Sequence, residues 1–328
     1  MLRGPAAPRS GRTRAHSLAV GALCALVACA PEISGLTTPS DPVSASRPAP
    51  PRPQTTLATA TPAPDTIQRY FQTLESRRLA DGLMRQDRRP ADLPITARIL
   101  EDGFVRIALY EEYDFVDGRI VERKTPSVLR RWDAPVRMRL EFGASVPEAT
   151  RAEDRQFVTG YARRLSQLTR QPVSMVQGGA NFHVLVLSET ERRAIGPRLE
   201  QLVAGIDRTT VDLITDLPLG ISCLVLAFSR RGANVYTDAI AIIRAELPDL
   251  SRRACYHEEL AQGMGLPNDS PRVRPSLFND TSEFAVLTEL DELMLRMLYD
   301  PRLRPGIREA EARPIIRQIA AELMGAAS

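Results

Sequence analysis

A stretch without apolar periodicity, residues 30–65, limits what this chain can fold into. Proline, serine, threonine and alanine dominate it, most densely between Ser46 and Pro53. Such a segment cannot bury enough surface to offset the entropy lost on ordering, so residues 29–65 are predicted to be a disordered or polyproline-like tether. All folded structure is therefore expected in residues 66–328, as a single α+β domain near the upper end of the usual size range.

The segment before this tether has the features of an export signal. Residues 1–16 are polar and arginine-rich, and residues 17–28 form an apolar run that is too short to span a bilayer. The run ends in Leu-Val-Ala before Cys29, which resembles the lipobox of bacterial lipoproteins. Residues 1–28 are therefore expected to be removed and Cys29 to be lipidated. An ordinary signal peptide with a chance cysteine and an uncleaved N-terminal anchor remain the alternatives.

Lipid on Cys29 would hold the mature chain at a membrane of the cell envelope, facing the periplasm. By resemblance to lipoprotein sorting in Gram-negative bacteria, Ala30 in place of aspartate implies the outer membrane. Without the four arginines of the signal, 39 basic residues remain against 40 acidic ones, so the mature chain is about neutral. This balance gives no reason to expect nucleic acid. The expected partners are the membrane, through the lipid anchor, and an envelope protein or polymer.

Apolar spacing in residues 66–328 predicts helices and strands in a mixed order. Helices are expected at 65–79, 147–169, 190–204, 252–265, 286–298 and 310–325. Strands are expected at 132–142, 183–187, 221–228 and 235–245, with three short strands separated by turns within 96–122. The glycine pair in 177–180 is interpreted as a hairpin turn. Mixed strands with helices grouped after them favour an α+β fold.

Residues 257–269 carry the pattern most informative about chemistry. Metzincin peptidases share His-Glu-x-x-His-x-x-Gly-x-x-His-Asp on a helix: three histidines hold zinc, the glutamate is the general base and the glycine reverses the chain. An alignment that starts at His257 keeps the His-Glu pair, but its second ligand position falls on Ala261 and its glycine comes one residue late. An alignment that starts at Glu258 has the better spacing and is favoured.

In the favoured alignment the frame of the motif is kept and its zinc ligands are lost. The histidine positions hold Glu258, Gln262 and Asn268, the base position holds Glu259, the turn holds Gly265 and the trailing acid is Asp269. One carboxylate and two amides do not make a credible zinc site, and the mature chain has only two histidines, His183 and His257. No metal, cofactor or catalytic residue is therefore predicted, and Glu259 is the candidate base if the protein is an enzyme.

The same residues also have a plainer explanation, because a solvated helix face would show the same pattern. Apolar residues from Tyr256 to Met264 form one sector of the helix, and Glu258 and Gln262 lie opposite it. His257 lies at the edge of the apolar sector, where a packed histidine is commoner than a metal ligand. The motif could thus line a cleft or face water.

Several blocks after residue 255 occur in an order that resembles a known family. They are Glu258–Gln262, Gly265–Asp269, Ser276–Asp280, Leu287–Asp291 and Leu298–Arg302. Together they resemble an uncharacterised proteobacterial family, domain of unknown function 2927, over residues 125–325. The resemblance implies an envelope lipoprotein and no particular activity. The helix that ends at Tyr299 also looks like the C-terminal helix of metzincins, so the expected fold is a zincin-like mixed sheet with a central motif helix and C-terminal helices.

Cys223 and Cys255 are the cysteines of the mature chain besides Cys29. An even pair in an oxidising compartment favours a disulfide, and two separately buried thiols are the alternative. In the entropy model, closing a loop of about 32 residues would stabilise the fold by roughly 3–4 kcal/mol.

The sequence therefore favours an envelope lipoprotein of unknown biochemical role, with a non-catalytic, zincin-like binding domain. Two alternatives remain. One is a metal-dependent hydrolase or peptidase with an atypical site, and the other is a purely structural envelope protein.

Overall fold

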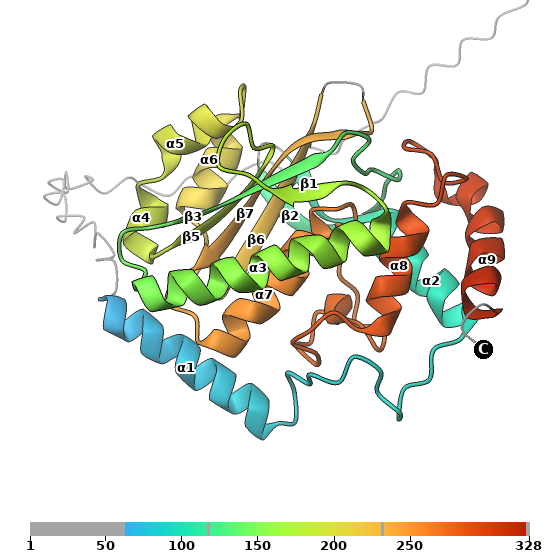
Figure 1. Ribbon diagram of the computed structural model, residues 1–328, viewed down its shortest axis with the longest axis horizontal. Coiled ribbons are helices and arrows are strands. Elements are labelled where there is room, and N and C mark those ends of the chain that lie inside the picture. Colours follow the sequence, from blue (N-terminus) through green and yellow to red (C-terminus); the bar gives the residue numbers. More distant parts are fainter. Residues whose placement is uncertain (1–62, 117–118, 231–232, 326–328) are drawn as a thin grey trace, which may run out of the picture. The chain divides into compact units, whose positions relative to one another are not determined.

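The chain forms a mixed five-stranded sheet with helices on both faces, as the computed structural model in Figure 1 shows. The structure describes residues 63–116, 119–230 and 233–325. The strands are β3 (Val136–Phe142), β4 (Val173–Met175), β5 (Phe182–Leu187), β6 (Cys223–Ser229) and β7 (Tyr236–Arg244), in the order β4-β3-β5-β7-β6. Strands β4, β3, β5 and β7 run parallel to one another, and the edge strand β6 is antiparallel to β7. The predicted α+β class is confirmed.

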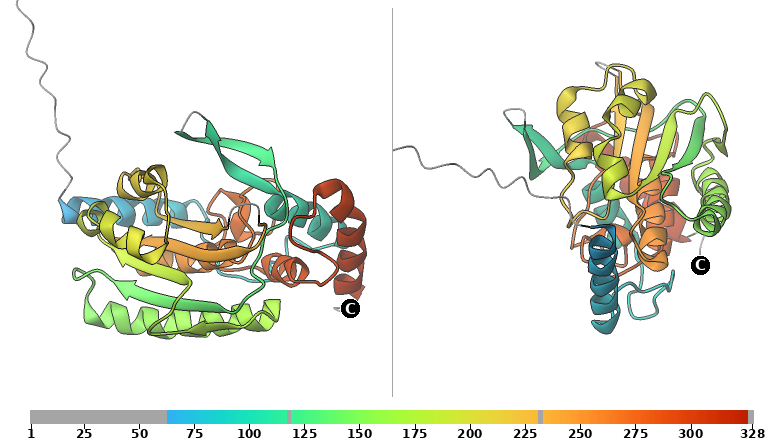
Figure 2. Two further views of the ribbon diagram at one scale, coloured as in Figure 1. Left: turned by 90° about the horizontal axis from the view of Figure 1, so that it is seen from above. Right: turned by 90° about the vertical axis from the view of Figure 1, so that its left-hand side faces the viewer.

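Both faces of the inner strands are buried under helices. Helices α3 (Glu148–Thr169) and α7 (Asp249–Gln262) lie on one face, and α4 (Glu189–Arg193), α5 (Gly196–Leu202) and α6 (Arg208–Thr215) lie on the other (Figure 2). All of β5 is buried, as its continuous apolar run predicts. Phe182, Val184 and Val186 pack in the core that contains α3 and α7, whereas Leu185 and Leu187 pack with α5 and α6.

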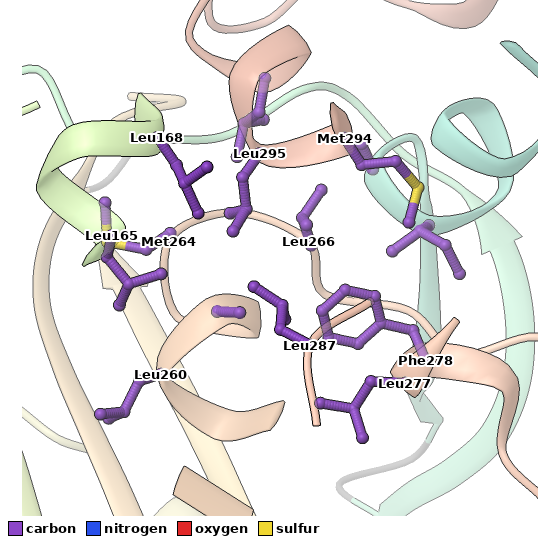
Figure 3. Packing of buried hydrophobic residues seen from close by; sticks show 14 of the residues in the cluster. Leu165, Leu168, Leu260, Met264, Leu266, Leu277, Phe278, Leu287, Met294 and Leu295 are labelled. Carbon is purple, nitrogen blue, oxygen red and sulfur yellow. The ribbon is translucent and has the colours of Figure 1, made fainter. Parts of the chain in front are cut away.

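The motif helix α7 is central because C-terminal helices and α3 enclose its inner face. Helix α8 (Glu289–Leu298) packs against α3 and against α2 (Ala97–Ala108), which in turn contacts α9 (Glu309–Gly325). Figure 3 shows Leu260 of α7 and Met264 of the turn that follows it in one cluster with Leu165 and Leu168 of α3 and with Leu295 of α8. Near them, Leu277 and Phe278 come from the short 3-10 helix η1 (Leu277–Asn279).

Helix α1 (Pro64–Ala80) covers the helix that was expected over 65–79. It buries Ile67 and Phe71 in the same core as α3 and α7. The lipidation site predicted at Cys29, the signal before it and the tether up to residue 62 lie outside the described residues. Among the described residues, no helix is long and apolar enough to cross a bilayer.

The strands predicted from residue 96 to residue 109 are wrong, because this segment is the helix α2. Thr96 caps it by accepting the backbone N–H of Ile99 at 3.2 Å. Leu100, Phe104 and Ile107 recur at helical spacing and are fully buried. The short apolar runs fit the period of a strand as well as that of a helix, and packing against α8 and α9 stabilises the helix. Strands follow as an antiparallel hairpin of β1 (Tyr110–Val116) and β2 (Arg119–Pro126).

Two further connections differ from their prediction. Residues 177–180 are not a hairpin turn, because the strands they join, β4 and β5, lie on opposite sides of β3 and do not pair with each other. The helix predicted over 190–204 is broken into α4 and α5. A capping box of Ser188 and Glu191 starts α4, and Pro197 in the first turn of α5 supports a fresh start there.

A disulfide joins Cys223 of β6 to Cys255 of α7, with 5.9 Å between the two Cα atoms. The expected pairing is therefore present. It ties the edge strand to the motif helix on one side of the sheet, and it fixes the separation between these two elements.

Gly265 is required by its backbone conformation and by its close surroundings. Its φ is +128°, and a Cβ at this position would lie 2.3 Å from the carbonyl oxygen of Arg130. We expect Gly265→Ala to lower the free energy of unfolding by at least about 2 kcal/mol. Gly160→Ala, inside α3 with open space around it, should instead raise it by about 0.5–1 kcal/mol. Urea denaturation of both variants measures this, and similar effects at the two positions would contradict it.

Candidate functional site

A cleft of about 730 Å³ lies between the edge strand β6 and the motif helix α7. One wall is the segment from Gly220 to Ala227 together with Ser229, and the other wall includes Glu258, Glu259 and Gln262. The polar face of α7 therefore lines a cleft. The sequence had left open whether this face lines a cleft or is a solvated helix surface. Further charged residues around the cleft are Arg78, Glu111, Arg130, Arg230, Asp269 and Asp280.

The strand wall presents backbone hydrogen-bonding groups to the cleft. In the described part of the chain, β6 pairs with β7 alone, and all seven of its residues are only half-buried. The N–H of Arg244 donates to the carbonyl of Ser222, so Ser222 belongs to a hydrogen-bonded pair with β7. Because antiparallel pairs alternate, the N–H and C=O groups of Cys223, Val225 and Ala227 point to the outer edge.

Two adjacent glutamates, Glu258 and Glu259, make the α7 wall of the cleft acidic. Glu259, the candidate base, is only 4% exposed although it lines the cleft. The Sγ of Cys223 and carboxylate oxygens of Glu258 and Glu259 lie within 4.8 Å of one another. This set has the donor types of a metal site, but the sulfur of Cys223 is held in the disulfide and offers no thiolate. Two carboxylates remain, and they suit a hard cation better than zinc.

The structure places the remaining ligand positions of the motif differently from the favoured alignment. Gln262 lines the cleft, and its Nε2 donates to Oδ1 of Asp269 at 3.0 Å. Asn268, expected at the third ligand position, is buried outside the cleft and donates its side-chain N–H to the carbonyl of Arg106 at 2.6 Å. Helix α2 thus holds Asn268, and Asp269 faces Gln262 in its place. Gly265 lies in the turn that follows α7 and has a positive φ.

Neither histidine of the expected mature chain is placed to bind a metal in the cleft. His257 packs between Phe157 and Tyr161, with ring centroids 5.3 and 4.6 Å away, and burial lowers its pKa to about 4. His183 lies on the opposite face of the sheet, where its Nδ1 is 3.7 Å from Glu141, and burial lowers its pKa as well. The two rings are thus separated by the sheet.

The first helix supplies residues to the site that sequence reasoning missed. Oε2 of Glu75 accepts the N–H of Ser251 at 2.9 Å and its hydroxyl at 2.7 Å, so α1 caps the first turn of α7. Arg78, one turn further along α1, lines the cleft. Burial lowers the pKa of Arg78, and the negative charge of Glu258 opposes this shift. No sequence motif in α1 indicates that Glu75 and Arg78 contribute to the site, because their contribution depends on how α1 packs against α7.

Aromatic side chains hold the turn that follows α7. The indole N–H of Trp132 donates to the carbonyl of Gly263 at 2.8 Å, and the hydroxyl of Tyr299 donates to the carbonyl of Met264 at 2.9 Å. Both acceptors are carbonyls at the end of a helix, which need partners when they are buried. The turn that leads to Asp269 is therefore fixed from the sheet side and from α8.

The fold and the site define an α+β domain with a cleft between an antiparallel edge strand and a motif helix. The family profile described as a protein of unknown function, DUF2927, matches residues 97–318, and the chain belongs to this family. The match begins at α2, earlier than the sequence blocks indicated, and it leaves α1 outside. No curated protein and no solved structure matches the chain.

The buried His257 should make stability depend on pH. Its pKa of about 4 in the folded protein lies below its ordinary value, so the unfolded chain binds more protons between these values. The stabilising contribution is complete above the ordinary pKa and is lost as the pH falls towards 4. Between pH 7 and pH 4, the free energy of unfolding of the wild type should therefore fall by roughly 2–3 kcal/mol more than that of His257→Phe. Urea unfolding at both pH values measures this difference, and parallel pH dependences of the two proteins would refute it.

Proposed function

We propose that this protein is a lipoprotein of a proteobacterial envelope and that its zincin-like domain binds an extended polypeptide segment without hydrolysing it. The signal-like N-terminus, the lipobox-like residues before Cys29 and the proline-rich tether support the lipoprotein part. In this proposal the tether carries the folded domain away from an outer-membrane lipid anchor and into the periplasm.

Several features support a zincin-like relation. The mixed sheet has one antiparallel edge strand, β6, and the motif helix α7 directly follows β7. The motif face of α7 lies across the cleft from β6, and Gly265, three residues after the last residue of α7, has a positive φ. The helix α8 packs against α3 and α2, and the hydroxyl of Tyr299, the residue after its last one, donates to the carbonyl of Met264 in the turn after α7. These features match the frame of the motif, while its three histidines are replaced.

One observation carries the binding proposal: the cleft follows the open edge of β6. Outward N–H and C=O groups at Cys223, Val225 and Ala227 can pair with a segment that adds as a further strand. Main-chain pairing of this kind gives affinity with little dependence on sequence, and side-chain pockets give preference. The occupant that fits is therefore an extended polypeptide.

The proposal is tested at Val225, whose N–H points outward. Proline there removes the outward donor without removing a bond to β7, and edge strands tolerate proline. A short fluorescein-labelled peptide of alternating threonine and valine is the probe, and fluorescence anisotropy measures its binding. Val225→Pro should weaken binding roughly tenfold, because one edge hydrogen bond and the fit of the strand are lost.

Val225→Thr is the matched control, since it keeps the N–H and the β-branched shape, and it should bind like the wild type. Thermal unfolding confirms that each variant is folded. The same mixture, analysed by mass spectrometry, should contain intact peptide. Equal affinity of the proline variant and the wild type would rule out pairing along β6.

A metal-dependent hydrolase is the second candidate, and the carboxylate pair of Glu258 and Glu259 beside Cys223 favours it. Its measurement is the metal content of the purified protein by mass spectrometry, with Glu259→Gln as the control. For the non-hydrolytic binding protein we expect less than stoichiometric metal in both proteins. Stoichiometric metal, with peptide cleavage that Glu259→Gln abolishes, would replace the binding proposal by the enzyme.

A further inference from the structure

We propose that the disulfide between Cys223 and Cys255 is a reversible redox switch of the cleft. The oxidised cleft binds an extended segment tightly, and reduction of the bond by a dithiol weakens this binding. The proposal rests on the proposed function and adds its regulation. The position of the bond carries it, because the bond joins two walls of the cleft that are each also held by contacts of their own.

The disulfide borders the cleft and can be reached from it. Both cysteines line the cleft. Cys255 is 3% exposed, whereas Cys223 is half-buried. The Sγ of Cys223 lies within 4.8 Å of carboxylate oxygens of Glu258 and Glu259, which line the same cleft. A small dithiol that enters the cleft therefore meets the bond at the sulfur of Cys223, and access of this kind is one condition for thiol–disulfide exchange.

The strand β6 keeps its place in the sheet without the disulfide. It pairs with β7 from its first residue to its last. The segment just before it is held by the buried side chain of Arg244, which donates to the carbonyls of Leu217, Pro218 and Ile221 at 3.0, 2.9 and 2.8 Å. These contacts come from the sheet and do not involve α7.

The helix α7 is likewise fixed by contacts that do not involve β6. Arg252 and Tyr256 bond the buried carboxylate of Asp154 in α3, at 2.9 and 2.8 Å. Glu75 of α1 accepts the N–H and the hydroxyl of Ser251 in the first turn of α7. Reduction of the disulfide should therefore leave both walls folded and release only the constraint on the distance between them.

This distance matters to a bound segment because the segment lies between the two walls. With the bond closed, the Cα atoms of Cys223 and Cys255 are held 5.9 Å apart. With the bond open, a segment paired along β6 has to fix the separation itself, and the entropy lost in doing so lowers its affinity. Because linkage is reciprocal, a bound segment must oppose reduction of the bond by the same factor.

The chemical step is an exchange between the disulfide and a dithiol. A thiolate of the dithiol attacks the sulfur of Cys223 and forms a mixed disulfide, and Cys255 leaves as a thiolate that takes up a proton. The second thiol of the dithiol loses its proton and displaces Cys223, which is protonated in turn, and a cyclic disulfide is released. Two electrons and two protons thus pass from the dithiol to the two cysteines, and reoxidation reverses the change.

The first experiment measures how the redox state changes affinity. The probe is the fluorescein-labelled peptide of threonine and valine, which contains no cysteine, and fluorescence anisotropy gives its affinity for the full-length protein. The oxidised protein should bind on the order of tenfold more tightly than the protein reduced with dithiothreitol, and reoxidation should restore the affinity. A variant with Cys223→Ser and Cys255→Ser is the matched control, and it should bind weakly with or without dithiothreitol.

Circular dichroism of the reduced protein and of the double variant keeps this comparison decisive. Both should have the secondary structure of the oxidised protein at the temperature of the binding measurement. Loss of structure on reduction would overturn the switch, because the bond would then hold the fold itself and not only the separation of the walls.

The second experiment measures the reciprocal effect of the peptide on the bond. The protein is equilibrated in mixtures of dithiothreitol and its cyclic disulfide, free thiols are alkylated, and mass spectrometry reads Cys223 and Cys255 separately. Saturating peptide should raise the ratio of dithiothreitol to its cyclic disulfide at half-reduction by the same factor, on the order of tenfold. Val225→Pro, in which peptide binding is weakened, should show a much smaller rise at the same peptide concentration.

Equal affinity of the oxidised and the reduced protein would overturn the switch and leave strand pairing along β6 intact. A half-reduction ratio that the peptide does not change, or changes equally in Val225→Pro, would also overturn it. Failure of the peptide to bind either redox state would overturn the proposed function and the switch together.

Discussion

A buried ion pair fixes the helix on which the rest of the site depends. Asp154 of α3 is 1% exposed, and its carboxylate accepts Nε of Arg252 at 2.9 Å and the hydroxyl of Tyr256 at 2.8 Å, both from α7. A buried pair adds little net stability, but loss of one partner leaves an uncompensated charge in the core. Only one position of α7 on α3 satisfies all of these groups, so the pair sets where the cleft lies.

The two walls of the cleft are held independently of any ligand. The Cys223–Cys255 bond sets the distance from β6 to α7, and Trp132 and Tyr299 hold the turn after α7 through its carbonyls. A wall that is fixed in advance loses little entropy when a segment binds. The disulfide and these two aromatic side chains therefore hold the surface of the cleft in position.

Much of the fold could be predicted from periodicity, because long amphipathic segments have one way to bury their apolar side. The helix α3, the strand pair of β6 and β7 and the buried strand β5 all follow from such patterns. Short apolar runs are ambiguous, which explains why α2 was predicted as strands. For the site, spacing indicated Glu258, Glu259, Gln262 and Asp269, but it could not show which side chains would share a space.

The sequence by itself determined the identity of the chemical groups: two cysteines that can pair, two adjacent glutamates, Glu258 and Glu259, and the polar side chains of Gln262 and Asp269. The tertiary structure alone decided their surroundings. The polar face of α7 lies across the cleft from β6, Asn268 is bonded to α2 outside the cleft, and Arg78 of α1 lines the same cleft although it is distant in the sequence. The physical reason is that burial and charge pairing depend on contacts between distant segments, whereas spacing along the chain specifies only local conformation.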